Sequence, residues 1–202
     1  MTVRIRPSAP MNNTNKLIIG LVGEKGGGKG TFTKVLREVA QGREITHIVF
    51  RDVIQETLEL WGIPATRQNL TKLAVSMTST FGDSAVAHAT LRKAENVESD
   101  IVIFDGIRWK GDVEGLRQLP NNILVYVTAD PEIRYQRAKA RKEKVGEESL
   151  AFEEFMKEEH LKTELLIPQI GKTADFTITN NGTFEEFKNQ VKDFYREVQL
   201  KS

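Results

Sequence analysis

Residues 23–31 have the residue types and the spacing of a phosphate-binding loop. They read G-E-K-G-G-G-K-G-T and lie between an apolar run at residues 17–22, which predicts a buried strand, and a helical pattern of apolar residues from Phe32 to Ala40. Glycines allow tight turns and let backbone N–H groups approach phosphate oxygens, and the start of a helix adds its positive dipole end. Lys29 can reach the β- and γ-oxygens of a nucleoside triphosphate as a point charge. The segment therefore predicts an ATP or GTP site, lined by Gly23, Gly26, Gly27, Gly28, Lys29, Gly30 and Thr31.

The loop departs from the Walker A pattern G-x-x-x-x-G-K-[ST] at one position. Gly30 stands where Ser or Thr normally offers a hydroxyl to Mg²⁺, and Thr31 follows it. Lys25 adds a second positive charge inside the loop, to which the sequence assigns no role beyond electrostatics. The alternative explanation is a glycine-rich turn with a chance lysine. The flanking strand and helix argue against it, because that context is what confirms the motif.

A carboxylate and an arginine follow another buried strand. The segment D-I-V-I-F-D-G-I-R places Asp105 and Arg108 after the apolar residues 101–104. Ligands of open parallel sheets bind at the carboxyl ends of the strands, where the phosphate loop also lies. We therefore expect Asp105 to hold Mg²⁺ through water and Arg108 to clamp an acceptor phosphate. The alternative is a turn with a surface salt bridge, because Asp-Gly-x-Arg alone is a weak signal.

A basic helical stretch in the second half of the chain supplies further positive charge. Arg134, Arg137 and Arg141 lie at i, i+3 and i+7, so they share one face. Phosphoryl transfer requires positive charge near the equatorial oxygens, and a mobile lid can supply it while it excludes water. We expect a helical lid at about residues 134–164, with Arg137 and Arg141 as catalytic residues and the acidic residues 147–159 folded back as its second arm. The alternative is a solvated basic face, since lysines are frequent in the same stretch.

The acceptor site is expected on helical segments at about residues 52–96. Asp52 follows the second predicted strand, and Arg67 opens a later helix. Arg67 could bind an acceptor phosphate, and Asp52 could face the acceptor at the same edge of the sheet. Taken alone, Asp52 is better explained as a helix N-cap, and the alternative for Arg67 is a surface arginine near a helix end. Trp61 and Phe81 could stack on a base, but core packing is the better explanation for both.

Strands and helices alternate along the chain. Five apolar runs predict strands, at residues 17–22, 45–50, 101–104, 123–127 and 175–179. Thr183-Phe-Glu-Glu186 predicts a capping box at the start of the last helix. Such alternation implies parallel pairing with right-handed crossovers. We therefore expect one three-layer α/β/α domain with a five-stranded parallel sheet over residues 17–202, preceded by a flexible leader at residues 1–16.

Composition bounds the class of protein and its partners. The chain has 202 residues, with 29 Lys and Arg against 28 Asp and Glu, so its overall charge favours neither nucleic acid nor a membrane surface. It has no Cys, and we interpret His47, His88 and His160 as surface or packing residues because they lack metal-ligand spacing. No apolar run approaches the roughly 20 residues that span a bilayer, and no secretory signal is recognised. These absences predict a cytoplasmic protein and leave its oligomeric state open.

From about residue 17 to 198 the chain resembles the nucleoside monophosphate kinase branch of P-loop proteins, in particular adenylate-kinase-related and dephospho-CoA-kinase-like proteins. The resemblance rests on the segments G-E-K-G-G-G-K-G-T, F-R-D-V-I-Q-E-T, A-T-R-Q-N-L, I-F-D-G-I-R, D-P-E-I-R-Y-Q-R and A-D-F-T-I-T-N-N-G-T-F-E-E-F. It implies that Mg²⁺ is held largely by water and substrate phosphates and that Thr31 contacts the phosphates. It also implies that Asn180, Asn181 and Gly182 approach the adenine of ATP.

The chain departs from its relatives in the second arm of the expected lid. Relatives often carry an Arg-Asp pair there, whereas this chain has Lys157-Glu158-Glu159. Because the arginine of that arm is missing, transfer would depend more on Arg137 and Arg141.

Motifs and resemblance together predict an ATP-dependent and Mg²⁺-dependent phosphotransferase that acts on a nucleoside or deoxynucleoside monophosphate. Two alternatives stay open. An enzyme similar to dephospho-CoA kinase would phosphorylate a ribose hydroxyl and would need a base, for which Asp52 is the candidate. An adenylate-kinase-like ATPase that serves as an RNA-processing or switch factor would hydrolyse ATP without a small acceptor.

Overall fold

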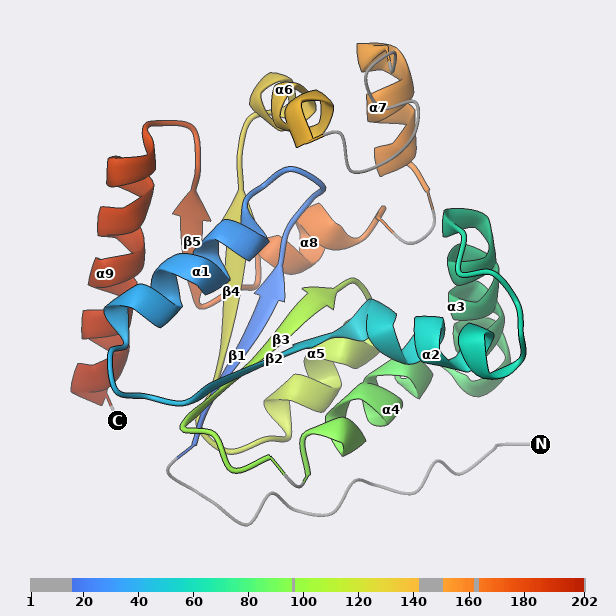
Figure 1. The fold of residues 1–202 in the computed structure, drawn as a ribbon, viewed down its shortest axis with the longest axis horizontal. Coiled ribbons are helices and arrows are strands. Elements are labelled where there is room, and N and C mark those ends of the chain that lie inside the picture. The colour runs from blue at the N-terminus through green and yellow to red at the C-terminus, as the bar shows by residue number, and fades with distance from the viewer. Residues whose placement is uncertain (1–15, 96, 142–150, 162–163, 202) are drawn as a thin grey trace.

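The computed structural model describes residues 16–95, 97–141, 151–161 and 164–201, and its centre is a parallel sheet (Figure 1). The sheet has five strands in the order β2-β3-β1-β4-β5, and every neighbouring pair is parallel. The strands are β1 (Leu17–Val22), β2 (Ile45–Val49), β3 (Ile101–Ile107), β4 (Asn122–Thr128) and β5 (Phe176–Thr179). This order confirms the predicted fold class.

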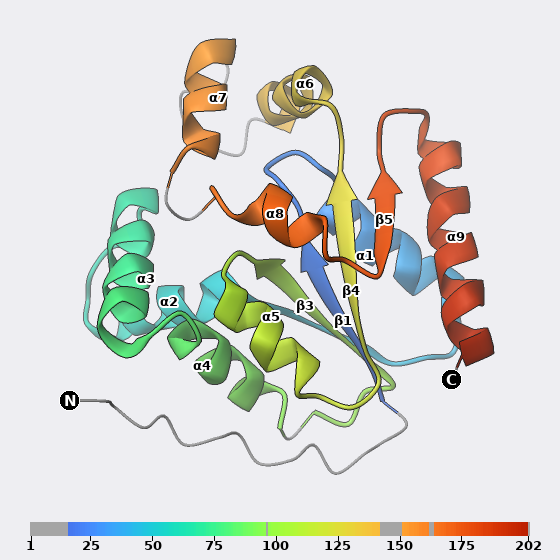
Figure 2. The ribbon, with the colours of Figure 1, turned by 180° about the vertical axis from the view of Figure 1, so that it is seen from behind.

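Helices cover both faces of the sheet, which makes three layers (Figures 1 and 2). One face is covered by α1 (Lys29–Val39) and α9 (Phe184–Lys201). The other face is covered by α2 (Phe50–Leu60), α4 (Ala85–Lys93), α5 (Lys110–Arg117) and α8 (Ile167–Gly171). Helix α3 (Arg67–Phe81) packs against α2 and α4, while α6 (Pro131–Arg141) and α7 (Phe152–Glu159) pack on each other above the sheet in Figure 1.

The central strand β1 is buried along its whole length because it contributes to two hydrophobic cores. Ile18 and Val22 join the core under α2, α4, α5 and α8, whereas Ile19 and Leu21 join the core under α1 and α9. Successive side chains of a strand point to opposite faces, so a strand covered on both sides needs an unbroken apolar run. That requirement explains why residues 17–22 show no polar alternation.

The carboxyl ends of the parallel strands meet at one edge of the sheet. In Figure 1 this is the upper edge, where the loop between β1 and α1 and the end of β3 lie below α6 and α7. Helices α2 and α3 lie to one side of it. The fold therefore brings the predicted phosphate loop and the predicted acceptor helices to the same edge, as the topology of parallel sheets requires.

Several elements differ from the predictions. Phe50 begins α2 instead of ending β2, and α5 and α8 were not predicted. The predicted helical stretch after residue 131 consists of α6 and α7, with residues 142–150 outside the described part. The interpretation of Trp61 and Phe81 as core residues was wrong, since they are 59% and 39% exposed. Trp61 is the C-cap of α2 and follows the buried Leu58 by three residues, and Phe81 is the last residue of α3.

The expected leader overlaps the fold at its last residue. Lys16 is buried and its amine donates a hydrogen bond to the carbonyl of Val97, while residues 1–15 lie outside the described part. Among the helices of the described residues, none combines the length and the hydropathy needed to cross a bilayer.

Candidate active site

The loop between β1 and α1 has the backbone of a phosphate cradle. Gly26 and Gly28 have φ angles of +82° and +114°, in the left-handed region that favours glycine. A Cβ atom on Gly28 would overlap the side-chain amide of Asn180, and one on Gly26 would lie 2.6 Å from the carbonyl oxygen of Arg134. Helix α1 begins at Lys29 with no acidic residue in its first turn. Its first N–H groups and its dipole therefore favour an anion at this loop.

Lys29 folds back over the loop that precedes it. Its Nζ donates hydrogen bonds to the carbonyl oxygens of Gly23 at 2.6 Å and Glu24 at 3.3 Å. Burial lowers the pKa of Lys29, and the nearby carboxylate of Asp105 opposes that effect. A phosphate oxygen at the loop would be a stronger acceptor than these carbonyl groups and would favour the charged amine.

The glycine that follows Lys29 is not required by packing. A Cβ atom at Gly30 would meet no other atom within 4 Å, and the residue has no positive φ. A serine would therefore fit at this position. The missing hydroxyl is a chemical difference from the Walker A pattern and has no steric origin.

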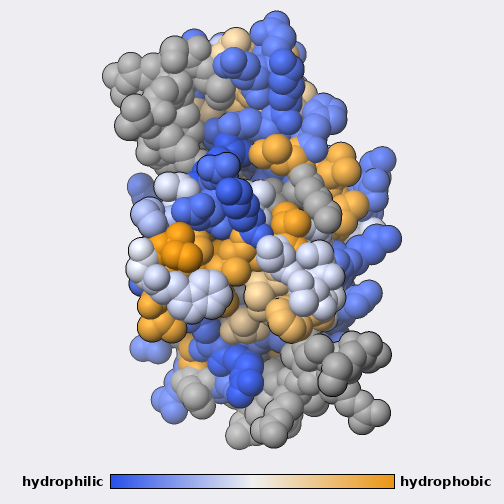
Figure 3. Space-filling view, turned by 90° about the vertical axis from the view of Figure 1, so that its right-hand side faces the viewer, coloured by the Kyte–Doolittle hydropathy of each residue, from blue (hydrophilic) through white to orange (hydrophobic). Residues whose placement is uncertain are grey.

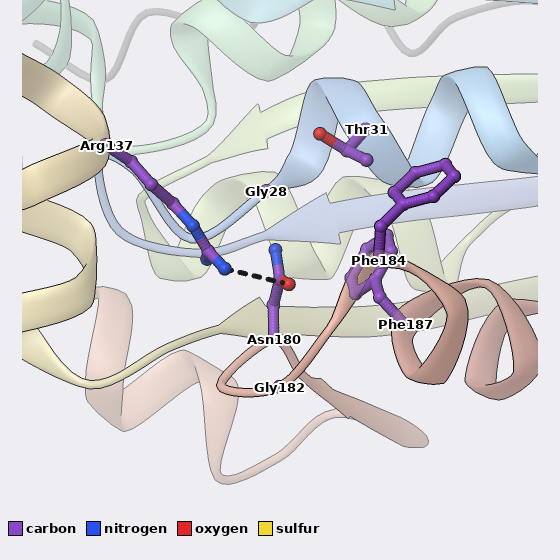
Figure 4. A pocket seen from close by; sticks show the side chains of 7 residues that line it. All are labelled: Gly28, Thr31, Arg137, Asn180, Gly182, Phe184 and Phe187. Atoms are coloured by element: carbon purple, nitrogen blue, oxygen red, sulfur yellow. Dashed lines mark hydrogen bonds between the residues drawn. The ribbon is translucent and has the colours of Figure 1, made fainter. Parts of the chain in front are cut away.

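A cavity of about 170 Å³ adjoins the loop (Figure 4). It is lined by Gly28, Thr31, Arg137, Asn180, Gly182, Phe184 and Phe187. Asn180 joins two of its walls: Nδ2 donates to the carbonyl of Gly27 at 3.1 Å, and Oδ1 accepts from Nη2 of Arg137 at 3.2 Å. Phe184 is 56% exposed at the rim. A guanidinium, an amide and an aromatic ring beside a phosphate loop suit a flat heterocycle with polar edges.

Asn181, one of the three residues expected near the base, does not line this cavity. Its Oδ1 accepts a hydrogen bond from the backbone N–H of Asp130 at 2.8 Å, which ties the loop after β5 to the start of α6. The flanking residues Asn180 and Gly182 line the cavity instead. Of the two asparagines, Asn180 therefore lines the cavity, and Asn181 bonds to the residue before α6.

Asp105 lies at the end of β3 with its carboxylate mostly buried. Its Oδ2 is 3.2 Å from Nε2 of His47, so the interpretation of this histidine as an ordinary packing residue missed a contact with the site. Its Oδ1 is buried and has no hydrogen-bond partner among the described residues. Such an atom suits a water ligand of Mg²⁺, which usually keeps several waters in a nucleotide site. The described residues contain no group of three His, Cys, Asp or Glu that could hold a metal by themselves.

Arg108 follows β3 on a turn that a buried carboxylate holds. Oδ2 of Asp112 accepts hydrogen bonds from the backbone N–H groups of Arg108 at 2.9 Å and Trp109 at 3.0 Å. Burial raises the pKa of Asp112 to about 7, although these hydrogen bonds and the charge of Arg108 oppose the rise. The guanidinium of Arg108 forms an ion pair with Glu164 at 3.3 Å. Arg108 follows Ile107, which pairs with Val22 at the end of β1, so it lies beside the start of the loop.

Arg67 is the first residue of α3, and Thr66 caps this helix by accepting a hydrogen bond from Asn69 N–H at 3.2 Å. The guanidinium of Arg67 forms an ion pair with Glu158 of α7. The other oxygen of Glu158 is 3.3 Å from Nζ of Lys25 in the phosphate loop. The structure thus brings the start of α3, the phosphate loop and α7 together.

Asp52 is not a helix N-cap, which corrects the simplest interpretation of this residue. Helix α2 begins at Phe50 after the N-cap position Val49, so Asp52 lies within the first turn. Its carboxylate makes no hydrogen bond or ion pair with the described residues.

Arg134 holds α6 and α7 together instead of sharing an exposed face with the later arginines. It is 4% exposed, its Nε donates to the carbonyl of Ala129 at 2.8 Å, and its guanidinium pairs with Glu159. Phe155 of α7 is buried against it, with the guanidinium carbon 5.9 Å from the ring centroid, and packs on Tyr135. Helix α7 is therefore docked on α6.

Of the two later arginines of α6, the structure describes the side chain of Arg137 and not that of Arg141. Arg137 reaches the cavity beside the loop (Figure 4). Arg141 ends α6, and its side chain lies outside the described part.

The fold and the site define a P-loop kinase-like protein: a parallel sheet with the central strand leading into a glycine-rich loop and lysine, and arginines from other segments beside it. A family model described as an AAA domain matches residues 19–161, more than half of the chain, and the protein belongs to this family. The match and the fold confirm the resemblance to nucleoside monophosphate kinase-like P-loop proteins.

Relatives of similar length extend over most of the chain. The UPF0200 protein PH1008 of Pyrococcus horikoshii is 29% identical over 181 residues, which cover 87% of this chain and 94% of the relative. The UPF0200 protein of Hyperthermus butylicus is 29% identical over 182 residues, which cover 90% of this chain and 95% of the relative.

Solved structures share the fold at low sequence identity. TT1252 from Thermus thermophilus has a TM-score of 0.61 at 20% identity, with 91% of this chain and 98% of that chain covered. Shikimate kinase from Bacteroides thetaiotaomicron has a TM-score of 0.59 at 14% identity, with 91% and 98% covered. At these identities the likeness concerns the fold alone.

Proposed function

We propose that the protein is an ATP-dependent phosphotransferase whose acceptor is a nucleoside or deoxynucleoside monophosphate. The observation that carries this proposal is the position of two arginines beside one donor loop. Arg67 shares the carboxylate of Glu158 with Lys25 of the loop, and Arg108 follows β3 next to Val22, the residue that precedes the loop. A guanidinium binds a phosphate through parallel N–H groups. Two of them suit an acceptor that carries its own phosphate.

The donor nucleotide would lie along the loop and the adjoining cavity. Lys29 and the loop N–H groups would hold the β- and γ-phosphates, while Asn180 and Phe184 would flank the base. Mg²⁺, when bound, would neutralise charge on the phosphates. Asp105 fits this ion because its buried Oδ1 can accept a hydrogen bond from a bound water.

The transfer itself would need little covalent chemistry from the protein. A bond forms between the γ-phosphorus and an oxygen of the acceptor phosphate, and the bond to the bridging β–γ oxygen breaks, which leaves ADP. The acceptor phosphate is already anionic, so no strong base is required. Arg67 and Arg108 would orient the acceptor, and Arg137 and Arg141 would stabilise the charge on the transferring group.

A second candidate is phosphorylation of a hydroxyl, as in a dephospho-CoA kinase-like reaction. The observation in its favour is the Asp52 carboxylate, which lies in the first turn of α2 and makes no hydrogen bond or ion pair with the described residues. A hydroxyl must lose its proton during transfer, and Asp52 would accept it. Asp52→Asn should therefore abolish hydroxyl phosphorylation and only weaken monophosphate phosphorylation.

The test is coupled ADP release from Mg-ATP with a panel of nucleoside monophosphates, deoxynucleoside monophosphates and dephospho-CoA. Lys29→Met should lower the acceptor-dependent rate by about 10²-fold or more, because it removes a charge that touches the transferring phosphates. Lys34→Met, an exposed lysine on the same helix, is the matched control and should leave the rate unchanged.

The panel separates the candidates. A Lys29-dependent rate with a monophosphate, well above the rate without acceptor, supports the proposal. A response to dephospho-CoA alone supports the hydroxyl reaction and removes the monophosphate assignment. Hydrolysis that no acceptor stimulates, or no turnover, contradicts both.

A further inference from the structure

The donor loop carries a second lysine that has no part in the proposed transfer. Nζ of Lys25 lies 3.3 Å from Oε2 of Glu158 and 5.8 Å from the ring centroid of Phe155, so the side chain extends to α7. Lys29, by contrast, bonds to carbonyl groups of its own loop. The two lysines of the loop therefore contact different parts of the protein. A role of Lys29 in donor binding does not explain why Lys25 contacts α7.

One carboxylate joins Lys25 of the loop to Arg67 at the start of α3. Oε1 of Glu158 accepts from Nη1 of Arg67, while Oε2 faces Lys25. The burial of Glu158 raises its pKa, but the hydrogen bond and the charge of Arg67, together with Lys25, outweigh that effect and keep the pKa below its usual range. A lysine and an arginine that converge on a single ionised group form the geometry of an anion site.

The start of α3 strengthens this site. Arg67 is the first residue of a helix of 15 residues whose first turn contains no acid, so the positive end of the helix dipole lies beside the guanidinium. Figure 3 shows this face of the molecule, where hydrophilic side chains extend from the top of the view into its centre between apolar patches. A carboxylate and a phosphate offer the same kind of oxygen pair to a guanidinium.

We propose that Lys25 and Arg67 form a subsite for a phosphomonoester dianion and that Glu158 is a built-in competitor, which the phosphate displaces. The identification of this dianion with the acceptor's phosphate rests on the proposed function. Glu164 binds Arg108 at 3.3 Å, so both arginines assigned to the acceptor are held by carboxylates from the segment that follows α6. A singly charged anion gains little by replacing a carboxylate, whereas a dianion gains an additional charge interaction. The arrangement therefore selects phosphate monoesters over singly charged anions.

The experiment measures the dissociation constant of inorganic phosphate for the full chain by isothermal titration calorimetry. Glu158→Gln should bind phosphate about two- to fivefold more tightly, the range expected when a half-exposed ion pair no longer competes. Lys25→Met and Arg67→Met should each weaken binding. Glu153→Gln, an exposed acid of the same helix, is the matched control and should change nothing.

A double variant isolates the competition from other effects. Inorganic phosphate can also enter the donor loop, but that binding does not involve Arg67. The gain from Glu158→Gln should therefore vanish in the Arg67→Met background. Equal or weaker phosphate binding by Glu158→Gln, or a gain that persists without Arg67, overturns the proposal.

This measurement needs no turnover, so its outcome is separate from that of the proposed reaction. If Glu158→Gln gains phosphate affinity while the acceptor panel gives no transfer, the subsite stands and the assigned reaction falls. If a monophosphate is phosphorylated and Glu158→Gln changes neither phosphate binding nor the KM for that acceptor, the reaction stands and the subsite falls.

Discussion

Replacement of Asn180 by alanine removes the side chain that connects the phosphate loop to α6. Asn180 is 8% exposed, and it bonds to the carbonyl of Gly27 at 3.1 Å and to Nη2 of Arg137 at 3.2 Å. A neutral hydrogen bond contributes about 1 kcal/mol and one to a charged group about 1.5–3 kcal/mol. Water can enter the adjoining cavity and replace part of the second bond. We therefore expect the free energy of unfolding to fall by about 2 kcal/mol.

Urea unfolding measures this loss. An unchanged m-value, the slope of the unfolding free energy against urea concentration, would show that the variant exposes as much surface on unfolding as the wild type does. Asn181→Ala is the matched control, because Asn181 is exposed and accepts one hydrogen bond, from Asp130 N–H at 2.8 Å; its loss should cost below about 1 kcal/mol. Affinity for a fluorescent ATP analogue should fall with Asn180→Ala and stay near the wild-type value with Asn181→Ala. The reasoning is refuted if Asn181→Ala costs as much as Asn180→Ala, or if Asn180→Ala stays within about 0.5 kcal/mol of the wild type.

Two further predictions concern the loop and the turn after β3. Gly28→Ala should lower the melting temperature, because φ is +114° and the new Cβ would overlap Asn180, whereas Gly30→Ala should raise stability by up to about 1 kcal/mol in open space at the start of a helix. Thermal unfolding would contradict this if both variants shifted the same way. Burial raises the pKa of Asp112 from 3.8 to about 7, so the folded protein holds a proton that the unfolded chain loses, and the associated stability is present below pH 3.8 and lost as pH rises to about 7. Asp112→Asn should remove that loss, at most about 4 kcal/mol, and identical pH profiles of the unfolding free energy for variant and wild type would contradict the assignment.

The sequence predicted the parts of the site that depend on neighbouring residues. The strand, the glycine-rich loop and the helix that starts at Lys29 follow one another within residues 17–39, so residue type and periodicity were enough to place them. The capping box at the last helix is equally local: Thr183 N–H donates to Glu186 at 2.7 Å and Glu186 N–H donates to Thr183 Oγ1 at 3.3 Å. The alternation of strands and helices predicted the parallel sheet, because crossover connections leave few other arrangements.

The tertiary structure decided which distant residues meet. Glu158 lies 133 residues from Lys25 and 91 from Arg67, and His47 lies 58 residues from Asp105. Periodicity shows which face of a helix or strand is buried, but it does not show which elements are neighbours or which side chain of an exposed segment turns inward. For that reason the resemblance placed Asn180, Asn181 and Gly182 together near the base, whereas packing brings only Asn180 and Gly182 of these three to the cavity. The ion pair of Arg67 with Glu158 likewise depends on the packing of α7, which contacts α6 and Lys25 of the phosphate loop.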